Sequence, residues 1–444
     1  MTKLQDDIEN YLSHSHPHSD EYHQAVREVF DDIAEVYRKE PAYRRWNIAE
    51  RMLEPDRIVR FRVCWEDDNG QVQVNRGWRV QFNNVLGAYK GGIRFDPSVN
   101  ESVLKFLGFE QCFKNALTGL PMGGGKGGAD FDPKGRSERE IMRFCQAYMQ
   151  ELHRHIGPNV DVPAGDINVG PREIGFLYGH YVKLTNRWEG VLTGKSPGFG
   201  GSCGRTEATG YGVVYFLKNM LQAHDQSLEG QRVLISGAGT VALYAAEKCI
   251  QEGAKVITVS DSGGTRVFRN GMSEKELVSL RTLKLEQHGS LEDADCGTWH
   301  SNKTPWFAAK GAIALPCATQ NEVDGKAMKR LIGNDLLALC EGANMPLTQE
   351  AHDKLIDANL LYGPGKAANA GGVAVSGLER SQNASLQSWS MDKVDTMLSG
   401  IMEDIHNRCI EHVKRKDGIY PYSKGANLYA FKKLAEAMMA YGVK

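Results

Sequence analysis

The sequence lacks a strong net charge, a long apolar run and a paired-cysteine motif, and each absence excludes a class of protein. The formal net charge is −2 over 444 residues, so no global field attracts nucleic acid or an anionic membrane. No apolar run approaches the roughly 18–20 residues that a membrane-spanning helix needs. The nine cysteines are scattered, and none forms a CxxC pair or a Cys/His spacing suited to zinc. We therefore expect reduced thiols, no metal, no membrane and no nucleic-acid partner.

The N-terminal end also lacks the features of a targeting segment. It has neither the apolar core of a signal peptide nor the Arg-rich face of a transit peptide, so we expect a soluble, cytoplasmic protein. His14, His16 and His18 lie near this end. We interpret them as part of a loosely ordered polar terminus, because a metal site would need ligands on a rigid frame.

What the sequence contains is an ordinary globular composition, with 41% hydrophobic and 24% charged residues in a chain long enough for two or three domains. Residues 20–60 show a helical period of apolar side chains, and residues 57–85 show alternating strands around a turn at 68–70. A glycine-rich block follows through residue 128. A segment rich in Gly, Ser, Pro and Thr at 190–204 reads as an interdomain linker.

Beyond this linker, strands and helices alternate. We predict strands at 233–236, 256–259, 312–315 and 336–340, with a helix at 241–252. This βαβ rhythm indicates a parallel sheet covered by helices on both faces. The fold class is therefore α/β: a mixed α/β substrate and oligomerisation domain over 1–199, and a Rossmann-like, doubly wound dinucleotide-binding domain over 200–419, with a cleft between them.

A GxGxxA fingerprint runs from Gly237 to Ala242, directly after the predicted strand at 233–236 and at the start of a helix. Gly237 permits a tight turn and Gly239 lets the backbone approach a pyrophosphate, which the helix N-terminus would bind. The alternative is a glycine turn in an empty βα unit. The strand before and the helix after the fingerprint favour a dinucleotide site.

The residues after the next strand bear on the choice of coenzyme. Asp261 lies about 20 residues past the fingerprint, where an acid binds ribose hydroxyls and favours NAD. Ser260 and Ser262 flank it, and Arg266 and Lys284 follow, which suits a 2′-phosphate. We predict NADP, with NAD as the alternative, and this preference depends partly on the family resemblance described below.

Three lysines stand in glycine-rich or patterned settings: Lys90, Lys114 and Lys126. The segment around Lys126 is not a phosphate-binding P-loop, because Leu120 replaces its first glycine and Gly127 its Ser or Thr. Lys114 is three residues after Gln111 in a predicted helix at 101–117, so the two side chains share a face and could hold a carboxylate. A small dianion would neutralise two of the three lysines, since burying an unpaired ammonium is costly.

The third lysine is better suited to proton transfer. Like charges and a desolvated, glycine-walled setting lower the pKa of a lysine towards neutrality, which favours Lys126 as an acid or base. Asp166, in a Gly/Pro-rich turn, is the natural carboxylate partner. The alternatives are an Asx-turn or helix cap for Asp166 and, for any single lysine, an ordinary surface position.

Five segments together resemble the short-subunit, hexameric glutamate dehydrogenases. The likeness covers residues from about 20 to 440, and its most specific part is Pro-Met-Gly-Gly-Gly-Lys-Gly-Gly at 121–128. The other segments are Tyr-Lys-Gly-Gly-Ile-Arg at 89–94, Asp-Val-Pro-Ala-Gly-Asp at 161–166, Glu-Ala-Thr-Gly-Tyr-Gly at 207–212 and Gly-Lys-Ala-Ala-Asn-Ala-Gly-Gly-Val-Ala-Val-Ser-Gly-Leu-Glu at 365–379.

This resemblance implies reversible oxidative deamination of L-glutamate to 2-oxoglutarate and ammonium with NAD(P), by a homohexamer without a metal. It also implies that the C-terminal helices, over 420–444, complete the first domain. The family pattern usually has Asn after the second fingerprint glycine, whereas this chain has Thr240, which can still donate a hydrogen bond.

The resemblance also implies roles for single residues. Lys90 and Ser376 would bind the γ-carboxylate of the substrate, and Gln111 and Lys114 its α-carboxylate. Lys126 would activate water and Asp166 would shuttle the amine's protons. The other residues implied at the substrate site are Gly91, Ala164, Gly165, Asn369 and Val373. Those at the coenzyme site are Thr209, Gly237, Ala238, Gly239, Thr240, Val241, Ser260, Asp261, Ser262, Lys284, Ala318, Thr319 and Asn344.

Two rival functions are weighed against this one. An amino-acid dehydrogenase acting on leucine, valine or phenylalanine would need an apolar side-chain pocket, in which Lys90 would be a buried, unpaired charge. A catalytically inactive nucleotide-binding scaffold would be marked by the loss of Lys126 or Asp166 from the sequence. Both residues are present.

Overall fold

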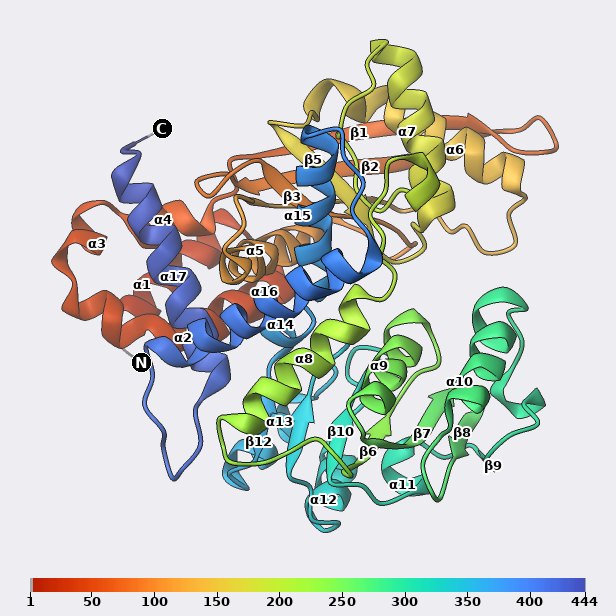
Figure 1. Cartoon of the computed structure of the whole chain (residues 1–444). Coiled ribbons are helices and arrows are strands. Elements are labelled where there is room, and N and C mark those ends of the chain that lie inside the picture. Colours follow the sequence, from red (N-terminus) through yellow and green to blue (C-terminus); the bar gives the residue numbers. More distant parts are fainter. Residues whose placement is uncertain (1–2, 444) are drawn as a thin grey trace. The chain divides into compact units, whose positions relative to one another are not determined.

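The computed structural model describes residues 3–443, and the chain divides into two compact units, each with its own sheet (Figure 1). The first unit comprises residues up to Cys203, Val375–Val394 and residues from Asn427 onwards. The second comprises Gly204–Ala374 and Asp395–Ala426. The first boundary lies inside the segment that the sequence indicates as a linker. Residues 375–394, which the sequence analysis assigns to the dinucleotide-binding domain, belong to the first unit.

The first unit begins with four helices, α1 (Lys3–Ser15), α2 (Asp20–Lys39), α3 (Pro41–Arg45) and α4 (Ile48–Leu53). The predicted apolar period is the buried face of α2. The expectation of a loosely ordered terminus was wrong, because Ile8 and Leu12 give α1 a buried apolar face. His16, which follows α1, is only 5% exposed.

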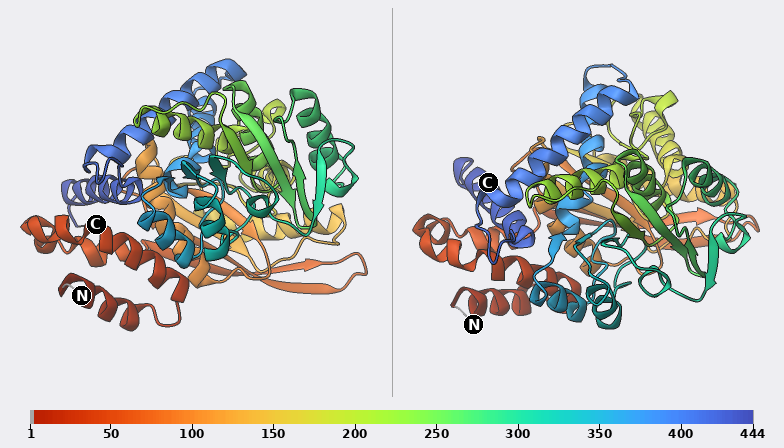
Figure 2. Two further views of the ribbon diagram at one scale, coloured as in Figure 1. Left: turned by 90° about the horizontal axis from the view of Figure 1, so that it is seen from below. Right: turned by 60° about the horizontal axis from the view of Figure 1, so that its bottom comes forward.

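The five-stranded sheet of the first unit has the order β1-β2-β4-β3-β5. Strands β1 and β2 form the predicted hairpin, whose Gly70 has a φ of +75°, and this hairpin protrudes at the edge of the sheet (orange in Figure 2). Strand β3 runs parallel to both β4 and β5. The strands are β1 (Arg57–Glu66), β2 (Val72–Asn83), β3 (Tyr89–Phe95), β4 (Gly124–Ala129) and β5 (Asp161–Gly165).

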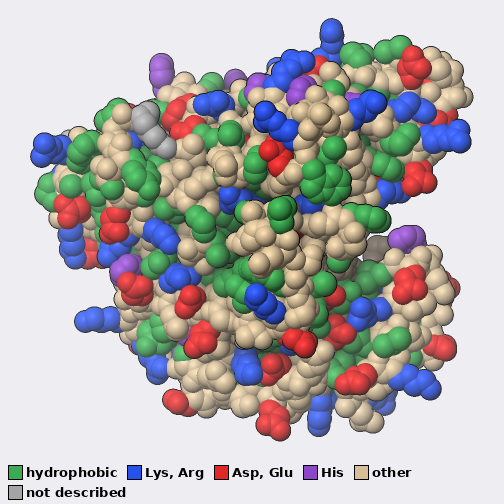
Figure 3. Space-filling view, turned by 45° about the horizontal axis from the view of Figure 1, so that its top comes forward, with side chains coloured by type: hydrophobic (Ala, Val, Ile, Leu, Met, Phe, Trp, Pro, Cys, Tyr) green, Lys and Arg blue, Asp and Glu red, His purple; other side chains and the backbone are tan. Residues whose placement is uncertain are grey.

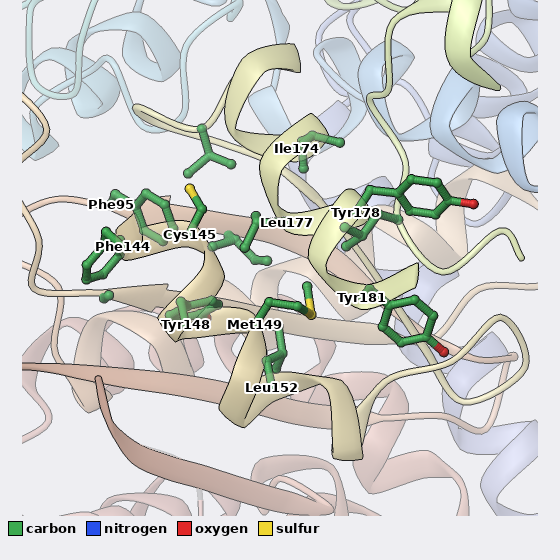
Figure 4. Close-up of a cluster of buried hydrophobic side chains, with 14 of the residues drawn as sticks. Phe95, Phe144, Cys145, Tyr148, Met149, Leu152, Ile174, Leu177, Tyr178 and Tyr181 are labelled. Carbon is green, nitrogen blue, oxygen red and sulfur yellow. The ribbon is translucent and has the colours of Figure 1, made fainter. Parts of the chain in front are cut away.

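Helices cover this sheet and complete its core. The predicted helix at 101–117 is α5 (Glu101–Thr118), which contacts β2 and β4. Helices α6 (Glu138–Leu152) and α7 (Pro171–Thr185) bury aromatic and aliphatic side chains against Phe95 of β3 and each other (Figure 4). Burial of this cluster fixes the strands that carry the candidate site.

The seven-stranded sheet of the second unit has the order β12-β11-β10-β6-β7-β8-β9. The five strands from β12 to β7 are parallel, which confirms the predicted parallel sheet, although β12 itself was not predicted. The antiparallel strands β8 and β9 were not predicted, because each has only four residues and a segment of 30 residues that contains a helix separates them. The strands are β6 (Arg232–Ile235), β7 (Lys255–Asp261), β8 (Gly264–Val267), β9 (Thr298–Ser301), β10 (Ile313–Leu315), β11 (Ala338–Cys340) and β12 (Leu361–Gly363).

Helices pack on this second sheet as a doubly wound fold requires. Helix α9 contacts β6 and β7, while α12 and α13 bury their apolar faces against Leu234, Ala314 and Leu339 of the strands. The helices are α8 (Ala208–Gln222), α9 (Thr240–Gln251), α10 (Glu274–Arg281), α11 (Pro305–Ala308), α12 (Gly325–Ile332), α13 (Gln349–Asp357) and α14 (Gly365–Ala368).

Three helices carry the chain from one unit into the other: α15 (Gly371–Ala384), α16 (Met391–Glu411) and α17 (Tyr422–Ala440). Among the residues described, no helix combines the length and apolarity that crossing a bilayer requires. Lysine and arginine side chains alternate with acidic ones over the face drawn in Figure 3, in keeping with the small net charge.

Candidate active site

Glycine-rich strands carry three of the predicted site residues on the sheet of the first unit. Lys90 lies on β3, Lys126 on β4, and Asp166 directly after β5. The glycines are needed for close approach: a Cβ at Gly91 would lie 1.7 Å from the carbonyl oxygen of Gly125. The glycine run around Lys126 is therefore a strand packed against its neighbours, which the sequence analysis did not predict.

Lys126 and Asp166 form an ion pair, with Nζ 3.0 Å from Oδ2. Lys126 is 6% exposed. Burial lowers the pKa of Lys126, the Asp166 carboxylate opposes this shift, and the guanidinium of Arg94 adds to it. For Asp166, burial alone would raise the pKa, but the charges of Lys126 and Arg94 outweigh it and hold that pKa far below its usual range. The pKa of Lys126 is therefore shifted in the direction that the sequence analysis expects.

Lys90 is fully buried and donates a hydrogen bond from Nζ to Oγ1 of Thr193 at 2.7 Å. Thr193 lies in the segment that the sequence indicates as a linker, and sequence reasoning gave it no role. Ser376, which is 1% exposed, belongs to the same unit as Lys90. The hydrogen bond joins β3 to the segment around Thr193.

Helix α5 contributes Gln111 and Lys114, both half-buried. Gln111 Nε2 donates to Oδ1 of Asn115 at 2.7 Å. Asn115, fully buried, donates in turn to the carbonyl oxygens of Lys90 and Gly123, at 3.2 and 2.5 Å. Asn115 thus ties α5 to the backbone of both glycine-rich segments, and it was also missed from the sequence.

A buried ion pair supports the strands from the other side. Arg79 on β2 contacts Asp161 on β5 through two hydrogen bonds, of 2.9 and 2.5 Å, and both side chains are fully buried. Its Nη1 also donates to the carbonyl oxygen of Gly91 at 3.1 Å. Next to this pair, Ala164 is buried and Gly165 is half-buried, and a Cβ at Gly165 would meet the carbonyl oxygen of Val169 at 2.2 Å.

In the second unit, the fingerprint glycines have different reasons to be glycine. Gly237 has a φ of +84°, which favours glycine, and its Cβ would lie 3.1 Å from the carbonyl oxygen of Cys317. Gly239 has a φ of −85°, and a Cβ there would meet nothing within 4 Å. Neither conformation nor packing within the protein explains Gly239, so the space beside it suits a ligand at the N-terminus of α9.

The predicted coenzyme-specificity residues lie around the end of β7. Asp261 Oδ2 lies 3.1 Å from Lys284 Nζ and accepts a hydrogen bond from the amide of Leu291 at 2.8 Å. Burial would raise the pKa of Asp261, but these two contacts outweigh it and lower that pKa. Ser260 is 7% exposed and accepts a hydrogen bond from the amide of Gly237 at 3.0 Å.

A cavity of about 450 Å³ opens between the start of α9 and the residues that follow α10. Arg266, considered from the sequence as a phosphate ligand, is not there: its guanidinium is buried and donates to the carbonyl oxygens of Leu291 and Glu292. Its charge stabilises a loop. The cavity is lined by Thr206, Thr240, Tyr244, Arg281, Lys284, Leu285, Glu286 and His288.

The remaining predicted residues lie mostly on loops of the second unit. Thr209 on α8 lies against Gly372, whose Cβ would be 2.5 Å from Oγ1 of Thr209. Asn369 Nδ2 donates to Oδ1 of Asn344 at 3.0 Å. The rest differ in exposure: Ala238 is buried, Val241 and Val373 are half-buried, and Ser262, Ala318, Thr319 and Asn344 are exposed.

Comparison with known proteins decides the family. Residues 200–442 match the model of the Glutamate/Leucine/Phenylalanine/Valine dehydrogenase family, and residues 55–183 match the model of its dimerisation domain. The chain belongs to this dehydrogenase family. One relative is the NADP-specific glutamate dehydrogenase of Salmonella typhimurium, 54% identical over 98% of each chain. Another is the NAD-specific glutamate dehydrogenase of Bacteroides fragilis, 51% identical over 98% of this chain and 99% of the relative.

A solved structure agrees with these relatives. The glutamate dehydrogenase of Plasmodium falciparum has a TM-score of 0.96 to this chain at 46% identity, covering 99% of this chain and 94% of that one. The resemblance stated from the sequence motifs is thereby confirmed, as is the two-domain α/β fold class. The sequence analysis gave roles to Lys90, Lys126 and Asp166, but none to Arg94, Thr193 or Asn115, whose partners lie on other elements.

Proposed function

We propose that the protein is a glutamate dehydrogenase that converts L-glutamate reversibly to 2-oxoglutarate and ammonium and prefers NADP to NAD. One observation carries the proposal. The ion-paired Lys126 and Asp166 lie on the same sheet as Lys90, a second buried lysine, which donates a hydrogen bond to Thr193. A substrate with one carboxylate at each end suits this arrangement, because each carboxylate can accept charge-assisted hydrogen bonds from an ammonium group.

In the proposed mechanism, Lys90 and Ser376 bind the γ-carboxylate, and Gln111 and Lys114 bind the α-carboxylate. Holding both ends fixes Cα for reaction. When bound, the nicotinamide coenzyme supplies the hydride acceptor. Neutral Lys126 then takes a proton from the water that attacks the resulting iminium, while Asp166 accepts and returns protons of the amine.

The preference for NADP rests on the surroundings of Asp261. An ionised Asp at this position would repel a 2′-phosphate, but Lys284 neutralises it at 3.1 Å. The cavity beside it also brings Arg281 and His288 near Thr240. Relatives at similar identity carry both coenzyme names, so this local charge balance is the argument for NADP.

We further propose that the chain assembles as a homohexamer in the cytoplasm. The match of residues 55–183 to a domain named for dimerisation supports assembly, and the nine free cysteines suit a reducing compartment. Light scattering of the purified protein should give six times the chain mass. A monomer would refute the assembly.

A spectrophotometric assay of NADPH oxidation tests the activity directly. Oxidation of NADPH should require both 2-oxoglutarate and ammonium, and it should run faster than oxidation of NADH at equal concentration. Turnover of 4-methyl-2-oxopentanoate instead of 2-oxoglutarate would favour an apolar amino-acid substrate. Binding of NADPH without oxidation would favour the inactive scaffold.

A further inference from the structure

Arg94, the last residue of the glycine-rich motif at 89–94 on β3, contacts the candidate acid–base pair. Its Nε donates to Oδ2 of Asp166 at 2.8 Å, and the arginine side chain is 16% exposed. Lys126 Nζ reaches the same oxygen at 3.0 Å. Within residues 3–443, no hydrogen bond to the other carboxylate oxygen, Oδ1, is present. Two cations therefore share one oxygen of Asp166.

The sheet register explains how this contact arises. In the parallel β3–β5 pair, Ile93 lies opposite Gly165, so the next residues along, Arg94 and Asp166, are brought side by side. Lys90, Gly92 and Arg94 alternate along β3 and so point to one face of the sheet. A Cβ at Gly92 would lie 2.7 Å from Cβ of Asp166. The bare backbone at Gly92 lets the carboxylate settle between the two cations.

We propose, on the basis of the function proposed above, that Arg94 is a positioning residue that fixes Asp166 through Oδ2 beside Lys126 and leaves Oδ1 for the substrate's amino group. If the Asp166 carboxylate could rotate freely, either of its oxygens could face Lys126 or the substrate's amino group. The Arg94 guanidinium removes that choice by donating to Oδ2, because its planar group holds its N–H donors in fixed directions relative to one another. The amine then meets one defined acceptor.

The same charge acts on Lys126. The charged groups nearest to this lysine are Asp166 and Arg94. Arg79 on β2 also acts on it, but the charge of Arg79 is matched by Asp161. Helix α5, which contacts β4, carries Glu110 and Lys114. Burial is the main cause of the lowered pKa of Lys126, and Arg94 lowers it further. Without the Arg94 charge, that pKa rises, so less neutral amine is available at a given pH.

Two variants and a matched control test the proposal. R94Q removes the charge, R94K keeps it, and R76Q is the control, since Arg76 on β2 makes the same Nε–Oδ2 contact of 2.8 Å with Asp130 but lies at an exposed position. Two readouts are compared over pH: kcat/KM for glutamate, and acetylation of Lys126 by acetic anhydride followed by mass spectrometry. Acetylation reports the neutral amine and does not depend on turnover.

We expect the rising limb of the R94Q profile and its acetylation midpoint to move up by about one pH unit, which is a tenfold loss of neutral amine below the limb. R94K and R76Q should keep the wild-type midpoint. Added guanidinium should restore activity to R94A, which provides a second test if R94Q folds poorly. A uniform loss of activity at every pH, with an unmoved midpoint, would overturn the proposal. Absence of glutamate turnover in the wild type would refute the proposed function instead, while the acetylation midpoint would still test Arg94.

Discussion

At the scale of single residues, the buried lysine on β3 makes the sharpest prediction about substrate choice. Lys90→Leu removes the charge expected to bind the γ-carboxylate, so kcat/KM for glutamate should fall by at least about 100-fold, equivalent to about 3 kcal/mol. Thermal unfolding should change little, because the leucine fills the space without a buried charge. Lys183→Leu, at an exposed position of α7, is the control. Full glutamate activity in the Lys90 variant would remove the γ-carboxylate assignment.

The acid–base pair predicts the direction of the pH dependence. Burial lowers the pKa of Lys126, so its neutral form appears at a lower pH than for an exposed lysine. Deamination needs this neutral form, so kcat/KM for glutamate should rise with pH through that lowered pKa and then level off. Initial rates with saturating NADP measure the profile. A flat profile across the neutral range would contradict the role of Lys126 as a base.

At the scale of elements, the turn before α9 allows a matched comparison of its two glycines. Gly239→Ala should leave the unfolding temperature unchanged and weaken NADPH binding by about tenfold or more, because only a ligand needs that space. Gly237→Ala should instead destabilise the fold by about 1 kcal/mol or more, since its φ is +84°. Fluorescence titration and thermal melts separate the two effects. Equal binding losses without destabilisation in either variant would refute this distinction.

The segment after α10 predicts a change in coenzyme choice. Lys284→Ala removes a cation from the cavity and frees Asp261 from its ion pair. The kcat/KM for NADPH should fall by about tenfold or more, while that for NADH should stay or rise, because the freed carboxylate can bind ribose hydroxyls. Assays with both coenzymes on one preparation give the ratio. Parallel losses for NADPH and NADH would show that Lys284 does not discriminate between them.

At the scale of the whole molecule, local patterns predicted what depends on local sequence. The β1–β2 hairpin, α5 and four of the five parallel strands of the second sheet were predicted because the apolar period and the turn residues are visible in the sequence itself. Arg94, Thr193 and Asn115 were missed because their partners are distant in sequence, and only strand register or helix packing brings them together. Arg266 shows the reverse error. Its position in the sequence suggested a phosphate ligand, but its guanidinium donates hydrogen bonds to carbonyl oxygens of a loop that no sequence pattern reveals.

The near-bare strand β4 has a consequence for redesign. At 124, 125, 127 and 128, an added methyl group would lie between 2.2 and 3.1 Å from neighbouring atoms. Substitutions at these glycines would therefore impair folding, whatever their effect on catalysis. Laboratory evolution towards a new amino-acid substrate would therefore have to rely on substitutions in α5 and in the segment around Thr193. The residues of β4 would stay unchanged, while substrate specificity would change through the residues around them.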